Sequence, residues 1–109
     1  MRKAIILLIS LILISCNFDE DIKIKYVVEG DGLFTITFQD ENKETIHIQQ
    51  IASGWTYEFT VAEQDYLHLS AWRGPEAGVV KVLIYKNGNI LKQAESSGAY
   101  AIAFISAYL

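Results

Sequence analysis

The stretch VVKVLIYKNGNILKQAE, residues 79–95, decides the fold class of this chain. Val79 to Tyr85 form a nearly continuous apolar run, which is typical of a strand in the centre of a sheet. Asn87-Gly88 follows, and this dipeptide is the strongest short signal for a tight hairpin. Ile90 to Glu95 form the return strand. The segment therefore predicts two antiparallel neighbouring strands joined by a two-residue turn.

The same kind of pattern extends in both directions from this hairpin. Apolar and polar residues alternate with a period of two over residues 22–28, 34–38, 55–61 and 67–71, and approximately over 45–51. Short breakers rich in Gly, Asp, Asn and Ser separate these runs, and none of them shows sustained helical spacing. About eight short strands at intervals of 8–12 residues predict an all-β, antiparallel, immunoglobulin-like β-sandwich of about seven or eight strands over residues 22–109.

The last predicted strand, residues 99–109, separates large side chains from small ones. Tyr100, Ile102, Phe104 and Tyr108 share one face, whereas the other face carries alanines. Such a strand suits close packing against the opposite sheet. We expect Tyr100 to lie in the core, with its hydroxyl group bonded to a loop.

The first residues have the features of an export signal. Arg2 and Lys3 precede an aliphatic run from Ala4 to Ile14, which is too short to span a bilayer and predicts a cleaved signal helix over residues 1–15. The run ends in Leu13-Ile14-Ser15-Cys16, which resembles the lipobox of bacterial lipoproteins. That resemblance implies lipidation of Cys16, with a palmitate-type acyl anchor. The alternative is an ordinary cleaved signal and a free thiol at Cys16.

Cleavage before Cys16 leaves one domain and an acidic surface. The mature chain holds seven basic and thirteen acidic side chains, a net charge of −6. This balance argues against nucleic acid as a partner and against electrostatic attachment to anionic lipid. Attachment to the membrane is therefore expected through acyl chains. Residues 16–21 form an acidic tether, read either as a solvated spacer or, through Asp19-Glu20-Asp21, as the surface-export signal of Bacteroidetes lipoproteins.

Several short motifs in a fixed order resemble those of one family. They are Tyr26-Val27-Val28-Glu29-Gly30, Trp55, Leu67-His68-Leu69-Ser70-Ala71, Asn87-Gly88 and Ser97-Gly98-Ala99-Tyr100-Ala101. Residues 24–106 are thereby similar to the MmpS-like accessory proteins of mycobacteria and their lipoprotein-like relatives in Bacteroidetes. The resemblance implies an immunoglobulin-like sandwich outside the inner membrane that assists a membrane transporter. The mycobacterial members carry a transmembrane helix and a cysteine pair, where this chain has Cys16 and, near the pair, Val82 and Phe104.

No arrangement of residues predicts catalysis, a metal site or a cofactor. His47 and His68 are the only histidines, and they fall on different strands without a third ligand at a suitable spacing. Both are expected on a polar face. Asp40-Glu41 and Asp31 could pair as carboxylates, but turns favour these residue types. The sequence therefore predicts a protein without enzymatic activity.

Two neighbouring residues are the candidate contacts for a partner. Trp72 falls on the face opposite Leu69 and Ala71, and Trp72 and Arg73 directly precede the breaker Gly74-Pro75. An exposed aromatic side chain at a loop often marks recognition, whereas packing under the loop is the alternative. Trp55 is expected to be structural. We expect an outer-membrane lipoprotein that serves as an envelope accessory module, with a transporter as one partner; the alternative is a cell-surface binding protein for an environmental or host ligand.

Overall fold

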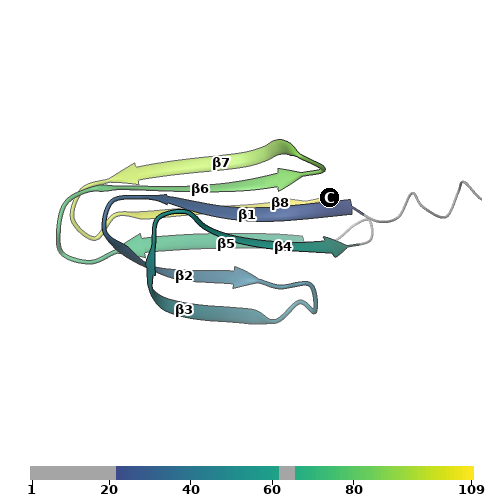
Figure 1. Cartoon of the computed structure of the whole chain (residues 1–109), viewed down its shortest axis with the longest axis horizontal. Helices are drawn as coiled ribbons and strands as arrows, with labels where there is room; N and C mark the ends of the chain where they lie inside the picture. Colours follow the sequence, from purple (N-terminus) through teal and green to yellow (C-terminus); the bar gives the residue numbers. More distant parts are fainter. Residues whose placement is uncertain (1–21, 62–65) are drawn as a thin grey trace, which may run out of the picture.

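A computed structural model describes residues 22–61 and 66–109, and these residues form eight β-strands in two antiparallel sheets (Figure 1). The strands are β1 (Ile22–Gly30), β2 (Leu33–Gln39), β3 (Thr45–Ala52), β4 (Trp55–Val61), β5 (Tyr66–Arg73), β6 (Val79–Lys86), β7 (Asn89–Ser97) and β8 (Ile102–Tyr108). The prediction of an all-β antiparallel sandwich is confirmed. The predicted signal helix and Cys16 lie outside the described residues. Within the described residues, no helix is long and apolar enough to cross a membrane.

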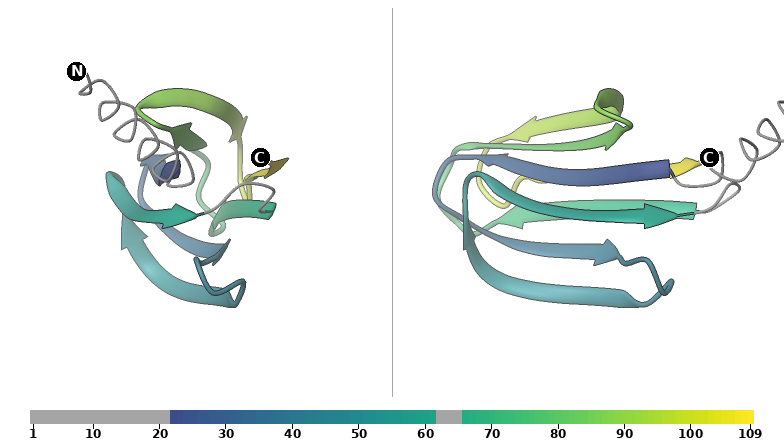
Figure 2. Two further views of the ribbon diagram at one scale, coloured as in Figure 1. Left: turned by 90° about the vertical axis from the view of Figure 1, so that its right-hand side faces the viewer. Right: turned by 45° about the vertical axis from the view of Figure 1, so that its right-hand side comes forward.

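Each sheet contains four strands, and the chain passes between the sheets repeatedly. Sheet A has the order β4-β1-β6-β7 and sheet B the order β3-β2-β5-β8. Only β2–β3 and β6–β7 are sequential neighbours within one sheet, so the other connections cross the sandwich (Figure 2). The start of β1 and the end of β8 lie at the same end of the molecule (Figures 1 and 2).

The hairpin predicted at residues 79–95 is formed by β6 and β7. Asn87 and Gly88 have φ angles of +50° and +87°, which are the angles of the two-residue turn that matches the twist of paired strands. Asn87 also ties this turn to β1, because its amide donates to the Lys23 carbonyl at 2.8 Å and its side-chain oxygen accepts from the Lys23 amide at 3.0 Å.

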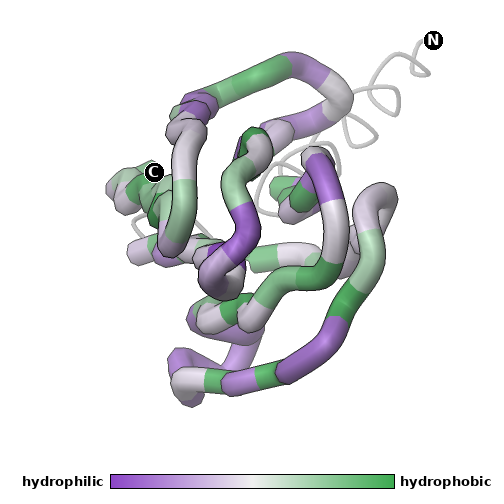
Figure 3. The backbone as a smooth tube through the Cα atoms, turned by 90° about the vertical axis from the view of Figure 1, so that its left-hand side faces the viewer, coloured by the Kyte–Doolittle hydropathy of each residue, from purple (hydrophilic) through white to green (hydrophobic). Residues whose placement is uncertain are grey.

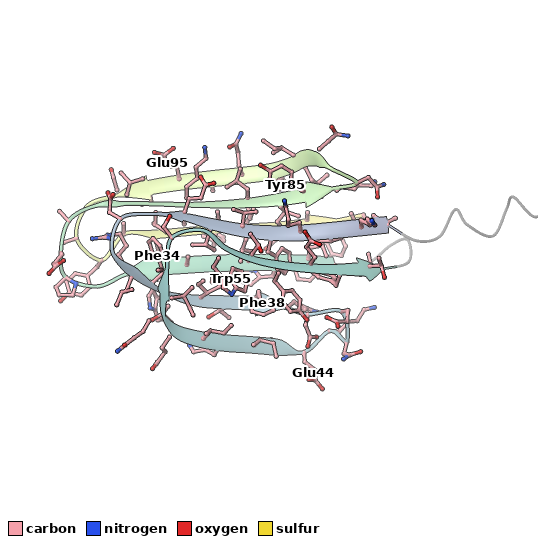
Figure 4. The ribbon with its side chains drawn as sticks, viewed as in Figure 1. Phe34, Phe38, Glu44, Trp55, Tyr85 and Glu95 are labelled. Atoms are coloured by element: carbon pink, nitrogen blue, oxygen red, sulfur yellow. The ribbon has the colours of Figure 1, made fainter. Side chains whose placement is uncertain are left out.

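The core lies between the two sheets and comes from alternate residues of every strand. Apolar and polar residues alternate along the tube in Figure 3, as a sheet with one buried face requires. Tyr26 is fully buried, and its hydroxyl group donates to the Gln39 carbonyl at 2.8 Å. Trp55 packs against Phe38 with ring centroids 5.2 Å apart (Figure 4), which agrees with its predicted structural role.

The last strand turns its small residues inward. Ala101, Ala103 and Ala107 are buried, whereas Tyr100 is 66% exposed. The expectation that Tyr100 lies in the core is therefore wrong. Tyr100 precedes β8 in a turn with φ of +58°, where its amide donates to the Gly74 carbonyl at 2.9 Å. The close approach of β8 to β6 and β7 of the opposite sheet favours methyl groups at the inward positions.

Candidate functional site

The two sheets differ sharply in charge. The strands of sheet A contain Lys23, Lys25, Glu29, Glu58, Lys81, Lys86, Lys92 and Glu95. The strands of sheet B contain one charged residue, Arg73, and its side chain is buried. The outward positions of sheet B therefore carry only neutral polar and apolar side chains. We call this surface the uncharged face.

The uncharged face is defined by the outward residues of four strands. They are Leu33, Thr35, Thr37 and Gln39 of β2, Thr45, His47 and Gln49 of β3, Tyr66, His68, Ser70 and Trp72 of β5, and Ile102, Phe104, Ser106 and Tyr108 of β8. The strand register places Thr37 beside both His47 and Ser70, and Ser106 beside His68, so these polar groups form continuous rows across the sheet.

Large apolar side chains gather along one margin of the uncharged face. Ile102 is 51% exposed, Phe104 62% and Tyr108 79%, and all three project from β8. Trp72 of β5 is half-exposed and pairs with Ile102, while Tyr66 of β5 pairs with Tyr108 at a ring-centroid distance of 4.9 Å. The stripe thus follows β8 and is interrupted by Ser106, whose Oγ atom is 3.2 Å from His68 Nδ1. Exposed apolar surface of this kind is a candidate interaction surface.

The structure separates the two predicted partner contacts. Trp72 is half-exposed at the surface, which was the first of the two interpretations of the sequence. Two hollows of about 300 Å³ each flank it. Arg73 points inward and is only 5% exposed. Its Nη2 atom donates to the carbonyls of Glu76 and Ala77 at 3.0 and 3.2 Å. Of this pair, Trp72 is therefore the side chain that a partner can touch, and Arg73 shapes the loop beside it.

The guanidinium group of Arg73 sits between two glycines. A Cβ atom placed at Gly78 would lie 2.6 Å from Cζ, and one placed at Gly32 would lie 2.9 Å from Nη1. Both distances are too short for a real side chain, so only glycine fits at these positions while Arg73 stays in place. Within the described residues, the buried Nε and Nη1 atoms have no hydrogen-bond partner.

Both histidines lie on the uncharged face, as predicted, and bond to hydroxyl groups of neighbouring strands. His47 Nδ1 is 2.8 Å from Thr37 Oγ1, and His68 Nδ1 is 3.2 Å from Ser106 Oγ. Burial lowers the pKa of His68 below its usual value, which favours the neutral ring. In the part of the chain that the structure describes, no three His, Cys, Asp or Glu side chains converge on a common point.

The carboxylates near the β2–β3 turn hold that turn together. Asp40 Oδ1 accepts from the amides of Asn42 and Glu44, both at 2.9 Å, which is the local bonding expected of a turn residue. Glu41 Oε1 accepts from the Tyr57 hydroxyl at 2.6 Å, and this bond, with burial and the charges of Glu41 and Asp40, raises the pKa of Tyr57 to about 12. Asp31 Oδ2 similarly accepts from the Val79 amide at 3.0 Å.

The outer surface of sheet A has a different character. Tyr85 and Glu95 lie on this side of the molecule (Figure 4), and the Lys25 ammonium stands 5.1 Å from the centre of the Tyr85 ring. A hollow of about 560 Å³ here is lined by both charged and apolar side chains, among them Lys23, Glu58 and Phe59. Charged side chains of both signs alternate on this surface, which is typical of contact with water.

The sequence indicated Trp72 as an exposed contact but did not indicate the face around it. The sequence does contain a signal for the uncharged face, since no charged residue follows Glu95 and the strands β2, β3 and β8 contain no charged residue. Period-two alternation alone does not show which strands share a sheet, so the shared absence of charge could be recognised only from the strand order.

A comparison with models of known protein families finds no family that matches this sequence, and a comparison with curated proteins finds no relative.

Proposed function

We propose that this protein is a lipid-anchored, non-enzymatic interaction module of the bacterial cell envelope. The observation that carries the proposal is the charge division between the sheets. Sheet B presents neutral residues and a stripe of exposed aromatic and aliphatic side chains, whereas charged residues gather in the strands of sheet A. One water-facing surface and one apolar surface suit a protein held at an interface.

The anchor is a diacylglyceryl group on the sulfur of Cys16; the signal helix of residues 1–15 is then removed, and the new amino group of Cys16 is acylated. Residues 16–21 tether the sandwich, and an outer-membrane location is favoured because Asn17, rather than aspartate, follows the cysteine. We describe the sandwich as immunoglobulin-like in architecture. Its two antiparallel sheets support that description, although β7 and β8 lie in different sheets rather than forming a terminal hairpin.

The partner that we propose is a membrane protein of the envelope, with a transporter as the first candidate. The similarity of residues 24–106 to the MmpS-like accessory proteins supports this choice. A cell-surface module for an environmental or host ligand is the second candidate, favoured by the acidic residues Asp19-Glu20-Asp21 directly behind the cysteine.

Metabolic labelling tests the anchor. Labelled palmitate should enter the wild-type protein and be absent from Cys16→Ala, while Ser10→Ala serves as a matched control within the signal and should keep the label. Mass spectrometry of the native N-terminus should find an acylated Cys16. A persistent label in Cys16→Ala would refute acylation at this position.

Crosslinking and surface proteolysis separate the two candidate partners. For an accessory module, crosslinking in intact cells should capture a membrane protein with the wild type and with Ile90→Ser, but less of it with Trp72→Ser. Recovery of the lipoprotein alone would count against this candidate. For a cell-surface module, added protease should cleave the sandwich on intact cells, and protection from protease would eliminate that candidate.

A further inference from the structure

We infer that the uncharged face lies flat on the membrane that holds the acyl chains, with zwitterionic lipid headgroups as its direct partner. This inference rests on the proposed anchor at Cys16. It goes further by assigning an orientation: sheet B faces the lipid, and sheet A with its charged residues faces the water.

The length of the tether brings the face within reach of the lipid. Ile22 begins β1 only six residues after Cys16, and an extended chain of that length spans at most about 20 Å. Tyr66 and Tyr108 lie at the same end of the sandwich as Ile22. Because packed sheets are about 10 Å apart, the outer surface of sheet B can meet the bilayer without straining the tether.

The composition of the face suits the headgroup region of a bilayer. Its apolar stripe combines Trp72 and Tyr108 with Ile102 and Phe104, and tryptophan and tyrosine are enriched at membrane–water interfaces. Its polar groups are uncharged hydroxyls, amides and imidazoles, which can bond to headgroups at less desolvation cost than charges. The acidic net charge of the mature chain disfavours anionic lipid, so zwitterionic lipid is the fitting partner.

A second copy of the chain is the other occupant that an exposed apolar face could take. The experiment below distinguishes the two, because a face covered by another protein molecule would not bring Trp72 to the acyl chains of the lipid.

The two tryptophans provide a test of the orientation. Trp72 lies six residues along β5 from Tyr66, about 20 Å from the anchored end. It therefore contacts lipid only if sheet B lies parallel to the membrane surface. Trp55→Phe leaves Trp72 as the only tryptophan, and Trp72→Phe leaves Trp55, which packs against the core. Each full-length protein is expressed in its host, purified as the lipoprotein and reconstituted in phosphatidylcholine vesicles with brominated acyl chains.

We expect about twofold quenching of Trp72, since a face buried about 5–10 Å reaches the upper acyl carbons, and little quenching of Trp55. Ile102→Glu, added to the Trp72 reporter, should abolish the quenching. Ile90→Glu is the matched control, because Ile90 is exposed to nearly the same extent, 49% against 51%, but belongs to sheet A.

Three results would overturn the inference. An acylated, vesicle-bound protein whose Trp72 is not quenched would refute the flat orientation while leaving the anchor intact, and would favour a protein partner for this face. Equal quenching in the Ile102→Glu and Ile90→Glu variants would refute the assignment of the face. An unmodified Cys16 and no attachment to vesicles would refute the proposed anchor, and this inference with it.

Discussion

Gly78→Ala should destabilise the fold by forcing a methyl group into the guanidinium of Arg73. The new Cβ atom would lie 2.6 Å from Cζ and 2.7 Å from Nη2, whereas carbon atoms in contact prefer about 3.5–4.0 Å. Arg73 cannot move aside without loss, because its side chain is buried and its Nη2 atom is hydrogen-bonded to two backbone carbonyls. A shift of about 1 Å would also stretch the hydrogen bonds from Nη2 to the Glu76 and Ala77 carbonyls.

The magnitude follows from two opposing effects. Overpacking in a closed site lowers the free energy of unfolding by about 1–3 kcal/mol. Replacing glycine by alanine restricts the unfolded chain, which raises the free energy of unfolding by about 0.4–1 kcal/mol. The backbone of Gly78 does not lie in the left-handed region, so no backbone strain is added. We therefore expect a net loss of about 1–2 kcal/mol in the free energy of unfolding.

Urea unfolding followed by tryptophan fluorescence measures this loss. With a slope of about 2 kcal/mol per molar urea, in the middle of the usual range, the midpoint should fall by roughly 0.5–1 M. Gly74→Ala is the matched control, because a Cβ atom there meets no atom within 4 Å, and its stability should be unchanged or slightly higher.

A double-mutant cycle identifies the cause. Arg73→Leu removes the guanidinium but keeps an apolar stem, so the cost of Gly78→Ala should largely disappear in that background. The reasoning would be refuted by a stability of Gly78→Ala equal to that of the wild type, or by the same loss with and without the guanidinium.

Three further predictions concern the turns and the titrating groups. Glu41→Gln should bring the pKa of Tyr57 from about 12 back toward 10 in an alkaline absorbance titration, and an unchanged pKa would contradict the assignment. The bond to Glu41 stabilises the fold below pH 10, and this stabilisation is lost as the pH rises through about 12. The lowered pKa of His68 means that the unfolded chain binds more protons just below pH 6.5, so stability should fall as the pH drops through that range, and His68→Gln should flatten this slope in urea titrations at several pH values. Gly88→Ala should cost about 1 kcal/mol in thermal unfolding, because φ is +87° there, and an unaltered melting temperature would exclude the two-residue turn.

The sequence predicted the strands well because their signals are local. Alternation with a period of two and short polar breakers locate all eight strands to within about three residues. The Asn87-Gly88 turn was predicted for the same reason, since two adjacent residues determine it. The grouping of the strands into sheets depends instead on long-range pairing, such as β1 with β6, which no local pattern encodes.

The buried face of the last strand also could not be predicted from the sequence. The sequence separated Tyr100 and Phe104 from the alanines but did not indicate which side was buried. The inward side is the small one, because β8 approaches the opposite sheet closely. The burial of Arg73 was equally hidden, since the two glycines that enclose it, Gly32 and Gly78, lie 46 residues apart in the chain.

Lys92 reaches from β7 to β8, where its ammonium group donates to the backbone carbonyl of Ser106 at 2.9 Å. β8 is an edge strand of sheet B, and the unpaired backbone groups of an edge strand can pair with a strand of another molecule. A lysine at an edge strand opposes such pairing, because the incoming strand would have to displace or bury the ammonium group. The anchor proposed at Cys16 would confine the molecules to a surface on which they meet often, and we expect the Lys92 amine to keep a dense layer of them from growing into fibrils.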